Sequence, residues 1–183
     1  MGNLLFSPSG RISRAEFMKG AYVLIALGAI ISLSALVSPT LSGILNIVGI
    51  VLLYCWIVLF IKRYHEAGKS GWMVFIPIIA YIVLAVLASM ILLPVLLGIM
   101  APEAATLQAE MEAAAEAAAE SGDLGAVFGA ALEGGQELAR ATAVPNTILG
   151  VLVGLAIAFL FNKIIPVDPG PNQYGPKGGD YIA

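Results

Sequence analysis

The chain has 183 residues, of which 60% are hydrophobic and 11% are charged, and its formal net charge is −3. Soluble domains average about half apolar and a quarter charged residues, so this composition excludes an ordinary soluble domain and is typical of a membrane protein. A single cysteine and a single histidine exclude an intrachain disulfide and a Cys/His metal site, and no cofactor is expected.

The first sixteen residues form a short polar motif, with turn-forming residues around Pro8 and Gly10. Ser13 is placed to cap a helix that begins at Arg14, and Glu16 follows three residues later, as in a capping box. We therefore predict that this N-terminal motif, residues 1–16, leads directly into the first apolar run.

Four apolar runs cover residues 17–37, 44–61, 73–100 and 144–167. Each is about 18 residues or longer, enough to cross ~30 Å of hydrocarbon as a helix. The sequence therefore predicts an all-α fold, a bundle of four membrane-spanning helices that forms one domain over residues 1–183.

An acidic, alanine-rich segment, residues 101–143, separates the third run from the fourth and contains eight of the twelve acidic residues. Its composition predicts one helix to about Ser121 and a shorter one over Leu124–Leu132, before Gly134 and Gly135. A charged side chain near mid-bilayer costs about 2.5 to 3.5 kcal/mol, so this helical insert is predicted to lie outside the membrane.

The basic residues indicate how the chain is threaded. Three lie before or at the start of the first run, three lie in the loop 62–72, and two lie at or beyond the end of the fourth run, whereas Arg140 falls on the other side. Basic loops stay in the cytoplasm. Both termini, the loop 62–72 and the tail 168–183 are therefore predicted to be cytoplasmic, and the acidic segment 101–143 extracytoplasmic.

The loop 62–72, with the sequence KRYHEAGKSGW, is the densest cluster of reactive groups. Its GKS triplet is like the end of a phosphate-binding P-loop, but that motif needs glycine where Arg63 stands, and no strand precedes it. Ser70 does not fit a nucleophile elbow, which requires glycine where Trp72 stands. His65 has no second histidine for a zinc helix. We therefore predict that the protein is not an enzyme.

Three motifs carry a resemblance to a known family: Phe6 followed by GRISRAEF in residues 10–17, KRYHEAGKSGW in residues 62–72 and GPNQYG in residues 170–175. Together they resemble the domain of unknown function 805 family, small bacterial inner-membrane proteins without an established activity. The resemblance covers most of the chain. It implies a multi-pass protein of the bacterial inner (plasma) membrane with all three motifs on the cytoplasmic face.

Arginine's planar guanidinium suits phosphate and carboxylate groups, so the first two motifs are predicted to bind anionic lipid head groups on the cytoplasmic face. A membrane-protein partner or a second copy of the chain is the other ligand considered, and nucleic acid is not expected, because no basic stripe is present. The residues predicted to make these contacts are Gly10, Arg11, Arg14, Phe17, Arg63, His65, Glu66, Gly68, Lys69, Ser70, Gly71 and Trp72.

A small transporter or channel is the alternative function. It would need a polar path through the bundle, and Asn46, Ser89 and Asn162 are the obvious candidates to line one. Transporters usually keep ionisable groups near mid-bilayer, and these four runs place none there.

The segments 10–17 and 62–72 should emerge next to each other, because a tight hairpin joins the first two helices. An unpaired carboxylate near the low-dielectric membrane interface is costly, so we predict at least one ion pair or hydrogen bond between the two segments. The pairs expected join Glu66 or Glu16 with Arg11, Arg14 or Arg63.

Overall fold

A computed structural model describes residues 2–177 of the chain. These residues are all-α, as predicted, apart from an isolated bridge between Asn172 and Gly175. The short helix α1 is not predicted by the sequence pattern, and residues 178–183 of the predicted tail lie outside the described residues. The elements are α1 (Gly2–Phe6), α2 (Arg14–Leu33), η1 (Ser34–Leu36), α3 (Pro39–Glu66), η2 (Gly71–Val74), α4 (Phe75–Met100), α5 (Ala104–Glu120), α6 (Leu124–Ala141) and α7 (Ala143–Ile164).

Four helical stretches are long and apolar enough to cross a membrane: Arg14–Leu36, Pro39–Glu66, Gly71–Met100 and Ala143–Ile164. They confirm the four predicted apolar helices. The first begins at Arg14 through the predicted capping box. The Glu16 N–H donates to Ser13 Oγ at 3.2 Å, and the Ser13 N–H donates to Glu16 Oε2 at 2.8 Å.

The second spanning helix is longer at both ends than the predicted 44–61. Pro39 occupies its first turn, where the fixed φ of proline is favourable, and Ser38 Oγ caps it by accepting the Leu41 N–H at 3.2 Å. At its other end α3 continues to Glu66, so the first part of the predicted loop 62–72 is helical. The buried partners of the side chains in this last turn, described below, stabilise the extension.

The fourth spanning helix is shorter than predicted and ends at Ile164 instead of continuing to Val167. Pro166 disfavours the helical conformation of the residue before it, and Ile165 accordingly adopts an extended backbone with φ −70° and ψ 117°. The backbone carbonyls at this end become available to a side chain from another helix.

The acidic insert forms a hairpin of two helices, α5 and α6. The prediction that α6 ends near Leu132 is wrong, because the helix continues through Gly134 and Gly135 to Ala141. Gly134 is where α5 packs against α6, since a Cβ atom there would lie 2.6 Å from Met111 Cγ. The glycine therefore permits close packing between the two helices and does not interrupt α6.

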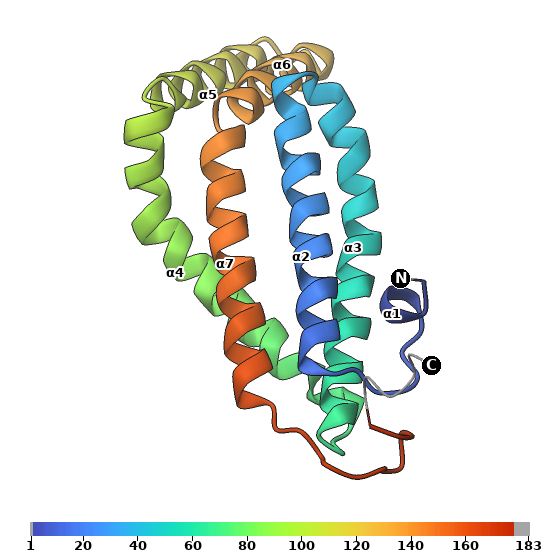
Figure 1. Ribbon diagram of the computed structural model, residues 1–183. Coiled ribbons are helices and arrows are strands. Elements are labelled where there is room, and N and C mark those ends of the chain that lie inside the picture. The colour runs from blue at the N-terminus through green and yellow to red at the C-terminus, as the bar shows by residue number, and fades with distance from the viewer. Residues whose placement is uncertain (1, 178–183) are drawn as a thin grey trace.

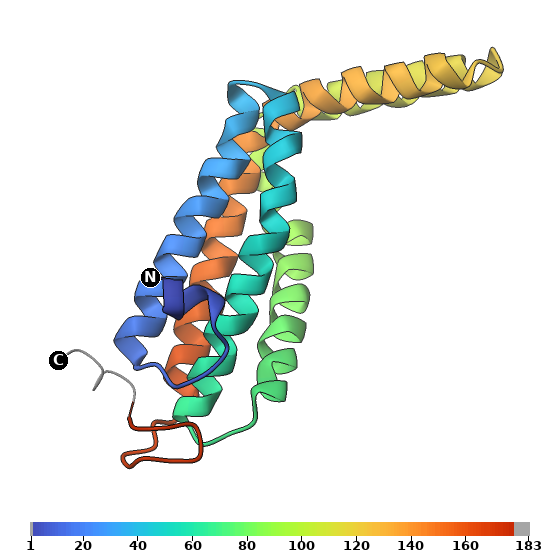
Figure 2. The same cartoon turned by 90° about the vertical axis from the view of Figure 1, so that its right-hand side faces the viewer.

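The spanning helices α2, α3 and α7 lie side by side, and α4 packs against α7. The α5–α6 hairpin lies across one end of this bundle and projects sideways beyond it (Figures 1 and 2). At the opposite end, α1 lies against α3, fixed by a hydrogen bond from Tyr54 Oη to the carbonyl of Phe6 at 3.0 Å. The chain after α7 passes below this same end.

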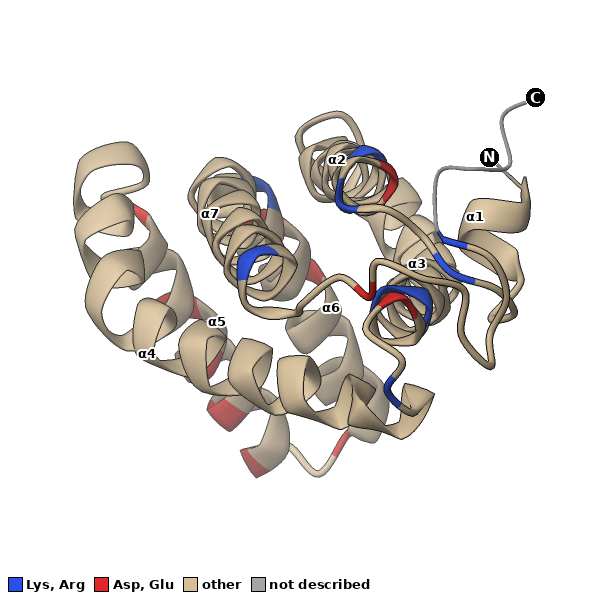
Figure 3. Ribbon diagram, turned by 60° about the horizontal axis from the view of Figure 1, so that its bottom comes forward, with Lys and Arg blue, Asp and Glu red and all other residues tan. Residues whose placement is uncertain are grey.

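Charge is divided between the two ends of the bundle. Figure 3 shows lysines and arginines gathered at the end that carries α1, whereas α5 and α6 at the far end carry acidic residues. This division is the one that the sequence implies from the positions of its basic residues.

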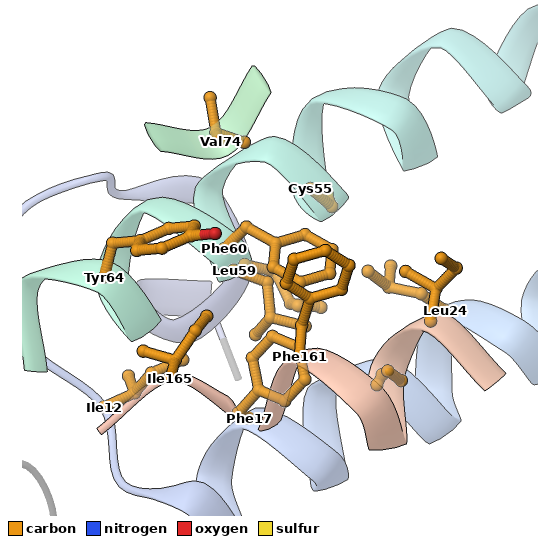
Figure 4. Packing of buried hydrophobic residues seen from close by; sticks show 14 residues of the cluster. Ile12, Phe17, Leu24, Cys55, Leu59, Phe60, Tyr64, Val74, Phe161 and Ile165 are labelled. Carbon is orange, nitrogen blue, oxygen red and sulfur yellow. The ribbon is translucent and has the colours of Figure 1, made fainter. Parts of the chain in front are cut away.

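The packed core lies in the half of the bundle near α1. Phe17 of α2, Phe60 of α3 and Phe161 of α7 meet there, with ring centroids 5.1 Å apart for Phe17–Phe60 and 5.9 Å apart for Phe60–Phe161 (Figure 4). Ile12 and Ile165 extend this core to the segments that flank the helices. The same aromatic core thus fixes the helix ends from which the sequence motifs project.

Candidate functional site

The three sequence motifs meet at the α1 end of the bundle. We call this assembly the three-motif cluster and define it as residues 10–17, 62–72 and 162–175. It joins the chain before α2, the end of α3 with the loop that follows it, and the end of α7 with the tail, so its parts are up to about 160 residues apart in sequence.

Arg11 is the centre of the cluster. Its Nε donates to Glu66 Oε2 at 2.8 Å in a salt bridge whose side chains are 0% and 1% exposed. This pair confirms the predicted contact between segments 10–17 and 62–72. The two terminal nitrogens donate to backbone carbonyls of the tail, at 2.7 Å to Gly170 and 2.9 Å to Asp168. One buried guanidinium therefore ties together all three motifs.

Arg63 is the second buried arginine of the cluster, and it is 0% exposed. Its Nε donates to Asn162 Oδ1 at 3.2 Å, and its terminal nitrogens donate to the backbone carbonyls of Asn162, Ile165 and Pro166. The last carbonyls of a helix lack intrahelical donors and form the negative end of its dipole, so a cation there is stabilising. Arg63 of α3 therefore caps α7 and closes its C-terminal end.

His65 holds the tail on the cluster by stacking. Its ring lies parallel to that of Tyr174, with centroids 3.7 Å apart and planes 5° from parallel. Its Nδ1 lies 3.1 Å from the carbonyl oxygen of Gly10. A carbonyl oxygen can only accept, so Nδ1 is the donor in this bond.

The turn of the tail packs on the loop at Gly68. Asn172 Nδ2 donates to the His65 carbonyl at 3.0 Å and to Asp168 Oδ2 at 3.2 Å. The Asn172 amide and the Gly170 N–H hold the pKa of the Asp168 carboxyl below its ordinary value, so this group is ionised at neutral pH. Gly68 has φ +69° and lies against these two side chains, a conformation that favours glycine.

The structure divides the predicted site residues into three groups by exposure. Arg11, Phe17, Arg63 and Glu66 are buried, His65 and the three glycines are half-buried, and Arg14, Lys69, Ser70 and Trp72 are exposed. Gly71 packs closely against α3, since a Cβ atom at this position would lie 3.0 Å from Ile61 Cγ2. The buried arginines are hydrogen-bonded within the chain, and Phe17 packs against Phe60. Among the exposed members, Arg14 donates to the Lys163 carbonyl at 3.5 Å.

Four exposed cations surround the buried cluster, and we call them the basic rim. They are Arg14 and Lys19 of α2, Lys69 of the loop and Lys163 of α7. Exposed Trp72 follows Lys69 in the same loop and stacks on Phe75, with centroids 5.9 Å apart. Cations next to an exposed aromatic pair at the end of a spanning bundle are typical of a membrane interface.

The predicted site residues all lie in segments 10–17 and 62–72, and none lies in the tail. Asp168, Asn172 and Tyr174 contact Arg11 or His65, although the predicted site residues include none of the three. Asn162, a candidate to line a polar path, makes an interhelical hydrogen bond with Arg63 of α3. The signal available was the turn-forming NQYG sequence, which predicts a tight turn but gives no indication of what that turn contacts.

Hydrogen bonds of the buried Arg11 side chain connect the three motifs of the cluster. No group of three or more His, Cys, Asp or Glu side chains that could hold a metal ion occurs within residues 2–177. Its buried arginines are already bonded to carbonyl and carboxylate oxygens, so the accessible chemistry lies in the basic rim.

A family model described as "Protein of unknown function (DUF805)" matches residues 5–176. No curated protein and no solved structure matches the chain.

Proposed function

We propose, for a chain that belongs to the DUF805 family of unknown function, that it is a non-enzymatic membrane protein whose basic rim binds anionic lipid head groups. The observation that carries this proposal is the division of the cations into two classes. Arg11, Lys62 and Arg63 are buried and hydrogen-bonded internally, whereas the rim cations Arg14, Lys19, Lys69 and Lys163 are exposed.

The buried arginines serve this function indirectly by fixing the segments from which the rim projects. Arg63 joins α3 to α7, so Lys163 and Lys69 lie on elements that are held together. Arg11 joins the chain before α2 to the end of α3, which places Arg14 at the same end of the bundle. A preformed arrangement of cations loses less conformational freedom when it binds than separate flexible side chains would.

The proposal includes a location and an orientation. The three-motif cluster and the basic rim face the cytoplasm, both termini are cytoplasmic, and the protein lies in a bacterial inner membrane. Basic residues at one end of the bundle and acidic residues at the other support this orientation (Figure 3). The cytoplasmic leaflet carries anionic lipids, and each nearby Lys or Arg is worth about 1 kcal/mol of attraction to it.

The rival function, a small transporter or channel, would need a polar path. A cavity of about 570 Å³ does lie among α2, α3, α4 and α7, but its walls are mainly apolar. Ser32, Asn146 and Thr147 line it towards the hairpin end, and Leu24, Phe60 and Ile157 line it towards the other. Of the three polar residues predicted to line a path, Asn46, Ser89 and Asn162, none lines this cavity. We therefore favour lipid binding.

The test is native mass spectrometry of the full chain in detergent, titrated separately with phosphatidylglycerol and phosphatidylcholine. The triple variant Arg14→Gln, Lys69→Gln, Lys163→Gln removes three rim cations. We expect it to bind phosphatidylglycerol more weakly, by about 1 kcal/mol for each cation removed, with phosphatidylcholine binding unchanged. Arg140→Gln makes the same chemical change at the other end of the molecule and is expected to leave both lipids unaffected.

Two results would contradict the proposal. One is unchanged phosphatidylglycerol binding by a triple variant that keeps the wild-type unfolding temperature. The other is a triple variant that binds lipid normally but loses a protein that co-purifies with the wild type, which would identify a protein partner as the ligand of the rim.

A further inference from the structure

Helix α6 carries apolar side chains along one exposed face. Leu124, Phe128 and Leu132 are four residues apart, so they lie on the same side of the helix, and they are 84%, 73% and 53% exposed. Leu and Phe side chains exposed at this regular spacing differ from scattered surface apolar residues and indicate a surface that contacts something apolar.

The direction of this face follows from what its far end touches. Leu132, Gly135 and Ala139 of α6 line a small cavity of about 220 Å³, with Ser42 and Asn46 of α3 on the opposite wall. Because residues three and four apart share a helix face, Gly135 and Ala139 continue the line begun at Leu124. The apolar face of α6 therefore turns towards the body of the spanning bundle.

The polar face of α6 points the other way. Glu133 and Glu137 are exposed and lie roughly half a turn from Leu124 and Phe128 on a helix of 3.6 residues per turn. The side facing α5 is fixed by Gly134, which lies against Met111. Helix α6 is thus apolar on the face that turns towards the spanning bundle and acidic on the opposite face.

The hairpin projects beyond the bundle, and its apolar face has no cover within residues 2–177. Figure 2 shows the far end of α5 and α6 extending past the spanning helices, and Leu124 and Phe128 lie in this projecting part. The spanning helices expose Ile44 and Ile47 of α3 next to the cavity, at 60% and 67%. The apolar face of α6 is therefore continuous with the lipid-facing surface of the bundle.

We infer that α6 is an interfacial helix, which lies in the head-group layer of the membrane with Leu124, Phe128 and Leu132 inserted into its apolar boundary. A helix with one apolar face and a charged opposite face adopts this position at a membrane surface. The membrane occupies the space into which the hairpin projects, because the helices beside it span that membrane. The hairpin therefore contacts lipid at the end of the bundle opposite the three-motif cluster.

The test uses nitroxide labels on the full chain in nanodiscs, in a background with Cys55→Ala. Labels at Leu124→Cys and Phe128→Cys probe the apolar face, and labels at Ala126→Cys and Glu137→Cys on the same helix are the matched controls. Lipid-soluble oxygen and a water-soluble nickel chelate report where each label lies. We expect the ratio of oxygen to nickel accessibility to be several-fold higher at positions 124 and 128 than at 126 and 137.

Equal ratios on both faces would place the helix in water and overturn the inference. Labels at 124 and 128 that are shielded from both reagents would show that protein covers this face, and they would equally overturn it. A second variant pair tests the energetic basis: Leu124→Glu should move the label at 128 into water, whereas Ala126→Glu should not. The outcome does not depend on the basic rim, which lies at the other end of the bundle.

Discussion

At the scale of single residues, the two buried arginines show how a charge can be kept at the end of a membrane bundle. Arg11 is 3% exposed and is bonded to one carboxylate and to several backbone carbonyls. Removing the guanidinium takes from the Glu66 carboxylate and from the carbonyls the hydrogen bonds that Arg11 donates, and losing such bonds at a buried site is costly. Arg11 is therefore needed to supply donors to the buried oxygen atoms around it.

We predict that Arg11→Ala lowers the free energy of unfolding by about 3 to 5 kcal/mol, the cost of breaking a buried ion pair. Arg14→Ala, which removes the same side chain three residues away at an exposed position, should change it by less than about 0.5 kcal/mol. Chemical denaturation in detergent micelles measures both. Equal effects of the two substitutions would show that the Arg11 network contributes nothing beyond an ordinary surface charge.

At the scale of elements, the tail behaves as part of the folded cluster although it lacks regular secondary structure. Its turn closes through reciprocal backbone hydrogen bonds between Asn172 and Gly175, of 3.1 and 2.9 Å. The turn is held on α3 by the stack of Tyr174 on His65 and on the chain before α2 by Arg11. Contacts with two other segments compensate for the missing helix.

We predict that Tyr174→Ala releases this turn while leaving the spanning helices intact. An aromatic pair contributes about 0.5 to 1.5 kcal/mol beyond its buried area, so the amides of the turn should exchange hydrogen roughly 2- to 10-fold faster. Tyr174→Phe keeps the stacked ring and should exchange like the wild type. Hydrogen exchange read by mass spectrometry on the peptide covering 168–176 gives the rates, and unchanged exchange in Tyr174→Ala would show that the stack does not hold the tail.

At the scale of the whole molecule, the division of charge between the two ends predicts the orientation in the membrane. Single cysteines at Ser70 and Ser121, in the Cys55→Ala background, report which side each end faces. We expect a membrane-impermeant thiol reagent to label position 121 from outside intact cells and position 70 only after the membrane is opened, because basic segments stay in the cytoplasm. Labelling of position 70 from outside would reverse the orientation.

The helix boundaries differ in whether the local sequence predicts them. The capping box at Ser13 and Glu16 uses residues three apart, so the start of α2 could be predicted locally and is confirmed. The end of α6 could not, because Gly134 is accommodated by Met111 of another helix. The end of α3 likewise depends on partners from α7 and the tail. Boundaries set by neighbours in the chain were predictable, and those set by neighbours in space were not.

The sequence alone predicted the all-α class, the four apolar helices and the contact between the motif before α2 and the motif that begins in the last turn of α3. Apolar run length and the cost of an unpaired carboxylate depend on composition and order, which the sequence contains. The tertiary structure decided which cations are buried and which are exposed. Arg11 and Arg14 are the same residue type three positions apart. Arg11 is buried and donates to the Glu66 carboxylate and to four backbone carbonyls, whereas Arg14 is exposed and donates to the Lys163 carbonyl at 3.5 Å. That difference comes from contacts between distant segments, which only the packed fold creates.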